Sequence, residues 1–314
     1  MSGADGIDWA GLATDPRPVL VIPVFHGGER IERCLRSLVC AHAYFAAAVL
    51  SINGRPDSRD LQVARAFQHD AGLPMAVFNT TVEMNSMDHI RFWAAELRRR
   101  NLPPTTHLMW LGHDDELDPD GLAAACPGGE WPLDQGTMIL GPWKLRHESV
   151  GTLYEPPEDE QLETWTCFPD QAVKPQASID WVCDQLLHPT YLNLTGGVFP
   201  FGSLLDIIDF RVRKTAGMRM EMTLATALGS RSITELDEPV TIVYGRADSD
   251  RATIPTAHAR SDDRHLLIWL ARYAARTPRA SARFASTIAR LTSLRTKVAL
   301  GRATLPDEDW VVRP

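Results

Sequence analysis

Adjacent carboxylates follow an apolar stretch in the segment Trp110–Leu117, which reads Trp-Leu-Gly-His-Asp-Asp-Glu-Leu. Asp114 and Asp115 would repel each other and lose hydration if nothing compensated their negative charge. A divalent cation that also holds a diphosphate would compensate it, and hard oxygen ligands suit Mn²⁺ or Mg²⁺. We therefore interpret Asp114 as the main cation contact and His113 as a candidate nitrogen ligand. The alternative is a solvated acidic loop that caps a helix starting near Asp118.

Two more polar loops follow apolar stretches earlier in the chain. The apolar run Val19–Val24 leads into Phe25-His26-Gly27-Gly28, and Ala47–Ile52 leads into Asn53–Ser58. Paired glycines at a strand-to-helix turn can bring backbone amides against a base or a phosphate. The first loop is therefore a candidate ligand loop, whereas the second is also consistent with an ordinary turn.

Strand and helix patterns alternate through the first half of the chain. Continuous apolar runs predict buried strands, and apolar residues at helical spacing predict the helices between them. The expected strands are Val19–Val24, Ala47–Ile52, Met75–Phe78 and His107–Leu111, and the expected helices are Glu29–Cys40, Ser58–His69 and Asn85–Arg100. This alternation predicts an α/β fold with a mostly parallel sheet, whose ligands bind at the carboxyl ends of the strands. The three polar loops lie at those ends.

The alternation loosens in the second half of the chain. Strands are expected at Thr137–Trp143 and Val240–Tyr244, helices at Ser203–Lys214 and Glu221–Leu228, and a long irregular loop at Tyr154–Gln176. The loop is expected because this segment is rich in proline and acidic residues.

Composition and charge exclude several classes of protein. A chain of 314 residues with 44% hydrophobic residues can bury a full core. The net charge of −8 argues against a nucleic-acid binder. Five scattered cysteines indicate neither a disulfide framework nor a zinc site, and no stretch is apolar enough to span a bilayer. We therefore expect a soluble cytoplasmic protein without a nucleic-acid partner.

The basic residues are unevenly distributed. Nine of the 32 Lys and Arg residues fall between Arg264 and Arg302, a stretch without Asp or Glu. We expect a basic helical extension over 251–314 after a domain at 17–250, with a flexible N-terminus at 1–16. The extension either docks on the acidic domain or makes peripheral contact with the inner membrane face, near a lipid-linked acceptor.

Five parts of the sequence together resemble the family 2 glycosyltransferases. Ile22–Leu38 is similar to that family's opening strand and helix, and Asn53 stands where the family usually has an Asp that reads the nucleotide base. Leu111–Leu117 resembles the family's Leu-Asp-x-Asp-Asp-x-Leu segment, which contains the metal-binding DxD motif. Thr195–Phe199 resembles the acceptor-side Gly-Gly motif, and Gly217–Leu224 resembles the segment that holds the catalytic base.

The resemblance spans roughly residues 17–245 and implies a GT-A fold, which is a Rossmann-like α/β architecture. It implies a nucleotide-binding half at 17–117 and an acceptor half at 118–250. The implied reaction is an inverting transfer of a sugar from a nucleoside-diphosphate sugar, with UDP-linked donors favoured. The acceptor would be a hydroxyl group on a sugar, a lipid-linked molecule or a small molecule.

The resemblance also implies roles for individual residues. Glu221 would be the general base that takes the proton of the acceptor hydroxyl. Mn²⁺ or Mg²⁺ would be the cofactor, with His258 as a further ligand beside Asp114 and His113. The residues implied in nucleotide-sugar binding are Pro23, Val24, Phe25, His26, Asn53, Asp114, Asp115, Gly196 and Gly197.

Three residues depart from the family pattern. Gly112 stands in place of the first DxD aspartate, Asn53 stands in place of an aspartate, and His26 stands where Asn is frequent. Two other functions therefore stay open. One is a sugar-phosphate nucleotidyltransferase on a related α/β fold, which would need a phosphate-binding loop after the first strand. The other is a non-catalytic nucleotide-sugar-binding module with a degenerate DxD motif.

Overall fold

The computed structural model of the chain describes residues 7–69, 72–134, 136–147, 162–166, 168, 174–187, 194–206, 227–245, 267–268 and 270–299. The strands are β1 (Val19–Val24), β2 (Ala47–Ile52), β3 (Met75–Asn79), β4 (His107–Trp110), β5 (Glu116–Leu117), β6 (Thr137–Leu140), β7 (Trp143–His147), β8 (Glu163–Trp165), β9 (Gln176–Ala177), β10 (Val198–Pro200), β11 (Ser232–Glu235) and β12 (Thr241–Gly245). The helices are α1 (Arg30–Ala41), α2 (Arg59–Phe67), α3 (Ser86–Arg99), α4 (Pro119–Ala125), α5 (Ser178–Leu187), α6 (Phe201–Leu205) and α10 (Pro278–Ala299).

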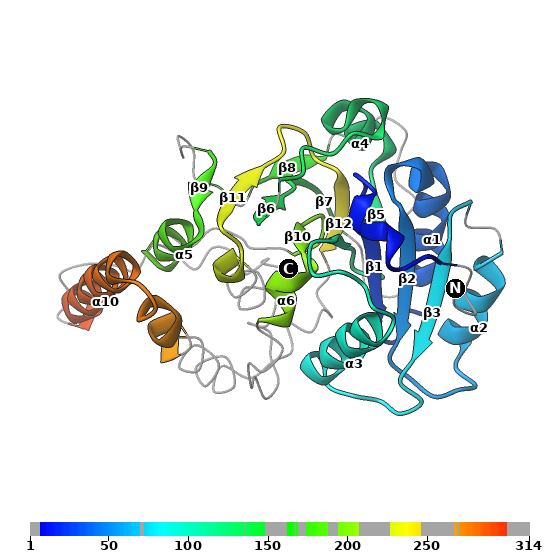
Figure 1. Cartoon of the computed structure of the whole chain (residues 1–314), viewed down its shortest axis with the longest axis horizontal. Helices are drawn as coiled ribbons and strands as arrows, with labels where there is room; N and C mark the ends of the chain where they lie inside the picture. Colours follow the sequence, from blue (N-terminus) through cyan, green and yellow to red (C-terminus); the bar gives the residue numbers. More distant parts are fainter. Residues whose placement is uncertain are drawn as a thin grey trace.

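The strands form two sheets (Figure 1). The eight-stranded sheet has the order β3-β2-β1-β4-β10-β6-β11-β9, and the four-stranded sheet has the order β5-β12-β7-β8. In the large sheet β1 pairs in parallel with β2 and β4, and Val19 lies beside Ala47 and Leu108. β10 is antiparallel to both β4 and β6, so it is a reversed strand within a mostly parallel sheet. The α/β class predicted from the sequence is confirmed.

Helices cover both faces of the large sheet, which explains why its strands are continuous apolar runs. Successive side chains on a strand point to opposite faces. Along β1, Leu20 and Ile22 belong to the buried cluster that contains the apolar side chains of α1 and α2. Val19 and Val21 belong to the cluster that contains those of α3 and α6. The parallel strands are therefore central elements of a layered core.

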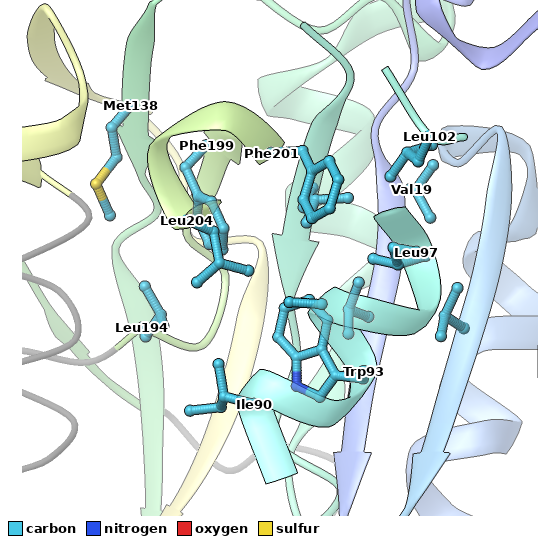
Figure 2. Close-up of a cluster of buried hydrophobic side chains, with 14 of the residues drawn as sticks. Val19, Ile90, Trp93, Leu97, Leu102, Met138, Leu194, Phe199, Phe201 and Leu204 are labelled. Carbon is cyan, nitrogen blue, oxygen red and sulfur yellow. The ribbon is translucent and has the colours of Figure 1, made fainter. Parts of the chain in front are cut away.

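The core on the α3 face is built around Trp93. Figure 2 shows Trp93 with Ile90 and Leu97 from the same helix, and with Leu204 of α6 in the same cluster. Trp93 is fully buried, and its ring centroid lies 5.8 Å from that of Trp110, the last residue of β4. Because protein interiors are close-packed, this contact fixes the end of β4 relative to α3.

The folded unit begins earlier in the chain than the sequence suggested. Ile7, Trp9 and Leu12 are buried in the core on the α3 face. Residues 7–12 therefore belong to the folded unit, in contrast to the flexible N-terminus expected over 1–16. Three apolar residues among glycines and acids are too few to show a helical or strand period.

The second half of the chain differs from the predicted elements in several places. The single strand expected at Thr137–Trp143 is two strands, because Pro142 lacks a backbone N–H and the chain passes there from the large sheet to the small one. The loop expected at Tyr154–Gln176 contains β8. Of the two predicted helices, Ser203–Lys214 is described only to residue 206 and Glu221–Leu228 only from residue 227. β9, β10, β11 and α5 were not predicted.

The basic C-terminal helix α10 docks on α5, beside which Figure 1 shows it. Arg283 lies 3.3 Å from an oxygen of Asp180 and 2.5 Å from an oxygen of Asp184, and Arg279 lies 3.2 Å from Asp180. Opposite charge therefore holds this part of the predicted extension, as the docked alternative expects. Within the described part of the chain, no helix has the length and apolar character needed to cross a membrane.

A buried histidine joins α3 to the sheet. His89 is only 3% exposed, and its Nε2 lies 2.8 Å from Oγ of Ser51 on β2. Burial, with a smaller contribution from the nearby His113, lowers the pKa of His89 to about 4. Histidines of an unfolded chain titrate at about pH 6.5. Folding therefore keeps this imidazole neutral at lower pH values, where the unfolded chain would protonate it.

We expect the folded state to lose stability as the pH falls from about 6.5 toward about 4, because only the unfolded chain then protonates His89. The loss from this residue between pH 7.5 and pH 5 is about 2 kcal/mol of unfolding free energy. Urea unfolding at both pH values should show a smaller loss in His89→Gln than in the wild type. The control is His69→Gln, at an exposed position. An equal loss in His89→Gln and the wild type would contradict the assignment.

Candidate functional site

The loops that follow β1, β2 and β4 meet at one edge of the large sheet. The Asn53 N–H donates to the carbonyl oxygen of Val24 at 2.9 Å, and the Leu111 N–H donates to that of Val21 at 3.0 Å. The His113 ring reaches back to the first loop, since a Cβ placed on Gly27 would lie 3.4 Å from its Cδ2. The three polar loops found in the sequence are therefore neighbours, as the carboxyl ends of parallel strands require.

The amides of the glycine loop already have a partner. The N–H groups of Gly27 and Gly28 donate to the two carboxylate oxygens of Asp60 at 2.9 and 3.0 Å. Asp60 lies in the first turn of α2. The expectation that these amides face a base or a phosphate is therefore wrong for this structure, because a protein carboxylate occupies the place of the anion.

The side chains of the first loop differ in what they can offer a ligand. Val24 is fully buried and Pro23 is half-buried, so their side chains belong largely to the sheet. Phe25 is 38% exposed, and its ring centroid lies 4.1 Å from that of His26. His26 has a φ of +51°, which is uncommon for a residue other than glycine and often marks a functional position. Phe25 and His26 are therefore the exposed side chains of this loop.

The carboxylate of Asp115 links three segments of the chain. It is 2% exposed, and Oδ2 accepts a hydrogen bond from the Thr195 hydroxyl at 2.8 Å. Oδ1 accepts one from the Tyr244 backbone N–H at 3.1 Å. The Thr195 oxygen in turn accepts the Gly112 N–H at 3.3 Å. Asp115 is therefore turned inward, where it joins the end of β4 to the Gly-Gly segment and to β12.

Gly112 leaves room for this inward carboxylate. A Cβ at position 112 would lie 2.5 Å from Oδ2 of Asp115 and 3.1 Å from Oδ1 of Asp114. The first distance is shorter than any ordinary contact, and Asp115 cannot move away without breaking its two hydrogen bonds. The absence of the first DxD aspartate is therefore a steric requirement of this segment and more than the loss of a ligand.

The Gly196-Gly197 segment continues the pairing between β4 and β10. The Gly196 N–H donates to the carbonyl oxygen of Trp110 at 2.8 Å, and the Trp110 N–H donates to that of Gly197 at 3.0 Å. Gly196 has a φ of +82°, and a Cβ there would lie 3.0 Å from Oγ1 of Thr241. The two glycines thus allow the backbone to approach β4 and β12 closely enough for Thr195 to reach Asp115.

Two further acids at this edge are compensated by basic side chains. Glu116 accepts a hydrogen bond from the Tyr244 hydroxyl at 2.7 Å and lies 3.0 Å from Nε of Arg33. The Arg33 guanidinium is 3.6 Å from the centre of the Tyr244 ring. Burial, followed by the hydrogen bond to Glu116, raises the pKa of Tyr244 to about 12, so its hydroxyl stays a donor. Lys144 lies 2.6 Å from Oδ2 of Asp118.

The described residues do not fit a preformed Mn²⁺ or Mg²⁺ centre. They contain no group of three or more His, Cys, Asp or Glu side chains that could hold one ion. Asp115, Glu116 and Asp118 direct their oxygens to protein donors, so the repulsion that suggested a cation is largely relieved without one. Cys34 lies behind the acids, and burial, then the charges of Asp115 and Asp114, raises the pKa of its thiol well above the usual value.

Asn53 makes its side-chain contacts within the protein. Its Nδ2 donates to the carbonyl oxygen of Met84 at 2.7 Å, and its Oδ1 accepts the Met84 N–H at 2.8 Å. The residue lies at the predicted edge of the sheet, beside the glycine loop. Its role in reading a base stays a prediction, although one donor hydrogen and one acceptor position are already used.

Two predicted site residues lie outside the described part of the chain. These are the proposed base Glu221 and the candidate metal ligand His258. The structure brings together the other predicted positions: the first loop, Asn53, the acidic segment and the Gly-Gly segment.

Sequence reasoning missed the partners that organise this edge. Asp60 and Tyr244 carried no motif, Arg33 lay within the Ile22–Leu38 motif without an assigned role, and Thr195 was noted only as the residue before Gly196. The hydrogen bonds from Thr195 and Tyr244 to Asp115 join residues 80 and 129 positions apart. The one local signal is the place of Asp60 in a first helical turn, where an acid faces the preceding loops.

Comparisons with known proteins identify the fold. No family model and no curated sequence matches the chain. Among solved structures, S. aureus TarS 1–349 in complex with UDP-GlcNAc has a TM-score of 0.56 and 11% identity, covering 90% of this chain and 73% of that one. The fold is that of the GT-A glycosyltransferases.

Two further structures agree with this assignment. S. aureus TarS 1–349 in another crystal structure has a TM-score of 0.52 and 13% identity, over 86% of this chain and 71% of that one. GalNAc-T7 with UDP, GalNAc and Mn²⁺ has a TM-score of 0.51 and 13% identity, over 82% of this chain and 49% of that one. At these identities the likeness establishes the GT-A architecture alone.

Gly112→Ala should destabilise the protein by about 1–3 kcal/mol, because the added Cβ overlaps the pinned Asp115 carboxylate. Gly112→Asp, which restores the family's aspartate, should be at least as destabilising. The control is Gly54→Ala, since a Cβ there meets Ser58 at an ordinary 3.8 Å. Chemical denaturation measures the three differences. A Gly112→Ala protein as stable as the wild type would show that Asp115 is free to turn away.

Proposed function

We propose that the chain is a glycosyltransferase that moves a sugar from a nucleoside-diphosphate sugar, with UDP-linked donors favoured, to an acceptor hydroxyl. One observation carries the proposal. The loops after β1, β2 and β4 meet at one sheet edge, and Thr195 ties the Gly-Gly segment to the acidic segment through Asp115. In an α/β sheet this edge is where ligands bind.

The ligands of structurally similar proteins support this choice of donor. TarS 1–349 was solved with UDP-GlcNAc and with UDP, and GalNAc-T7 was solved with UDP, GalNAc and Mn²⁺. In this chain Phe25 and His26 are exposed at the sheet edge formed by the carboxyl ends of β1, β2 and β4. We place the nucleotide over these two residues and the loop that begins at Asn53, with the backbone of Pro23 and Val24 beneath it.

In the proposed reaction the acceptor hydroxyl oxygen attacks the anomeric carbon of the donor sugar. The bond from that carbon to the diphosphate oxygen breaks, and the nucleoside diphosphate leaves with the bonding electrons. Attack opposite the leaving group inverts the anomeric configuration. Glu221 takes the hydroxyl proton as general base. Asp114 faces the donor, and Gly196 and Gly197 shape the acceptor side.

A divalent cation is proposed only as a ligand that arrives with the donor diphosphate. Asp114 is its main proposed protein contact, with His113 and His258 as further candidates. Such an ion would offset negative charge on the diphosphate. Because the described residues do not fit a preformed site, no step of the reaction above depends on the ion.

The acceptor and the cellular site are also proposals. A sugar, a lipid-linked molecule or a small molecule could carry the accepting hydroxyl. Peripheral contact of a cytoplasmic enzyme with the inner membrane face would have to use basic residues of the extension other than Arg279 and Arg283, which pair with α5.

The nucleotidyltransferase alternative is less well supported than glycosyl transfer. It needs backbone amides or basic side chains in the loop after β1 to hold a triphosphate. The amides of Gly27 and Gly28 instead bind the carboxylate of Asp60, which would repel phosphate. The second alternative is a non-catalytic module that binds a nucleotide sugar. Hydrolysis of a UDP-sugar by the purified chain would exclude this alternative.

UDP should raise the melting temperature, since a ligand of the native state stabilises it by mass action, and Mn²⁺ should increase the effect. Asp114→Asn should abolish the Mn²⁺-dependent part of UDP binding and keep the cation-independent part. Calorimetry in Mn²⁺ and in EDTA separates the two. The control is Asp120→Asn, which removes the same charge at an exposed position of α4. Equal UDP affinity of the wild type in both buffers would remove the cation from the proposal.

Glu221→Gln tests whether the chain is an enzyme and which group is the base. A base acts only in the transition state, so its loss should lower turnover and spare donor affinity. General-base catalysis contributes about 10²–10⁴-fold, so transfer should fall at least about 100-fold with the UDP dissociation constant nearly unchanged. Single-turnover kinetics with the donor and calorimetry measure the two quantities. Wild-type turnover in the variant would require another base.

A further inference from the structure

We propose that Asn53 is a positioning residue, whose side-chain amide holds the loop Thr80–Met84 in place, rather than the group that reads the nucleotide base. This loop follows β3 at the same sheet edge. The inference deepens the proposed function and rests on it for the identity of the ligand. The positioning role itself is a property of the protein alone.

The two hydrogen bonds of Asn53 to Met84 form a closed pair. Nδ2 donates to the Met84 carbonyl oxygen at 2.7 Å while Oδ1 accepts the Met84 N–H at 2.8 Å. The amide therefore pairs with a peptide group as a neighbouring strand would. Asn53 is 5% exposed, so water competes little for these bonds. The pair fixes Met84 just before Asn85, which caps the first turn of α3.

The rest of the loop is tied to the same point. The Thr80 hydroxyl lies 3.4 Å from Oδ1 of Asn53 and 2.5 Å from the carbonyl oxygen of Val82, and it accepts the Gly54 N–H at 3.1 Å. Thr81 has a φ of +64°, which is costly for a β-branched residue. Such a conformation persists only where neighbouring contacts hold it, and the Asn53 and Thr80 bonds lie on both sides of it.

The loop held in this way borders the proposed nucleotide position. Val82 is 58% exposed at its tip, and Oε1 of Glu83 lies 3.7 Å from Nε2 of His26. The His26 ring packs against that of Phe25 in a tilted arrangement. The loop Thr80–Met84 therefore lies beside Phe25 and His26, so a displacement of Met84 would move Val82 and Glu83 relative to Phe25.

The contact with Met84 requires a side chain that both donates and accepts a hydrogen bond, which accounts for Asn at a position where the resemblance expects Asp. An ionised carboxylate can accept the Met84 N–H but cannot donate to the Met84 carbonyl oxygen. It would instead place a negative oxygen against that carbonyl. A protonated carboxyl group has one donor and one acceptor, so it can restore both bonds.

Asn53→Asp is the decisive variant, because it restores the family's residue while breaking the pair. At pH 7.5 we expect UDP affinity to fall about tenfold or more, the effect of losing one buried hydrogen bond. Relative to wild type at each pH, affinity should recover to within about threefold at pH 5, as burial and the carbonyl oxygen favour the protonated carboxyl. Calorimetry measures both, and hydrogen exchange of the Met84 amide should accelerate at pH 7.5 without any ligand.

Other ionisable groups near Asn53 and Met84 are the same in the wild type and in Asn53→Asp. The ratio of the two UDP affinities at each pH therefore cancels the effect of their titration. These groups are His26, Arg55, Asp57 and Glu83. A second variant, Thr80→Val, loosens the same loop without adding a charge. It should weaken UDP binding and accelerate exchange in the loop at both pH values, with no recovery at pH 5.

Two outcomes separate the possible failures. If Asn53→Asp leaves Met84 exchange unchanged at pH 7.5, the positioning role is wrong, whatever the UDP affinity. If the wild type binds no nucleoside diphosphate while Asn53→Asp still accelerates Met84 exchange, the proposed function fails and the positioning role stands.

Discussion

The buried carboxylate of Asp115 holds the candidate site together. It is the common partner of the Thr195 hydroxyl and the Tyr244 backbone N–H, so it connects the large sheet to the Gly-Gly segment and to the small sheet. Burying a carboxylate costs free energy unless hydrogen-bond donors satisfy its oxygens. Removing one donor would leave a carboxylate oxygen buried without a partner, which destabilises the folded state. Gly112 is part of the same constraint, because only a residue without Cβ leaves space for the carboxylate.

This constraint changes how the acidic segment should be interpreted. A run of acids at the end of a strand suggests a cation, because like charges repel in a partly buried place. Here Asp115 is satisfied by two donors, Glu116 by Arg33 and Tyr244, and Asp118 by Lys144. Most of the segment is therefore a structural joint between the two sheets. The proposed ligand contacts therefore lie in the loops after β1, β2 and β3, with Asp114 as the proposed cation contact.

The strands of the first half of the chain, and the polar loops that follow them, could be predicted from the sequence. β1 and β2 have the predicted bounds, because a strand buried on both faces is a continuous apolar run that ends where polar residues begin. β9, β10 and β11 are two to four residues long, so they show no period, and their pairing depends on partners distant in the chain. The same is true of Trp9, whose burial is a tertiary contact without a local pattern.

The sequence alone determined the fold class, since apolar periodicity and parallel strands are compatible with few other arrangements, and it predicted the sheet edge at which a ligand should bind. Only the tertiary structure decided what the polar groups at that edge do. The Gly27 and Gly28 amides face Asp60, and the Asn53 amide faces Met84. A residue type specifies which hydrogen bonds a side chain can make, whereas the partner that satisfies them is set by segments that meet only on folding.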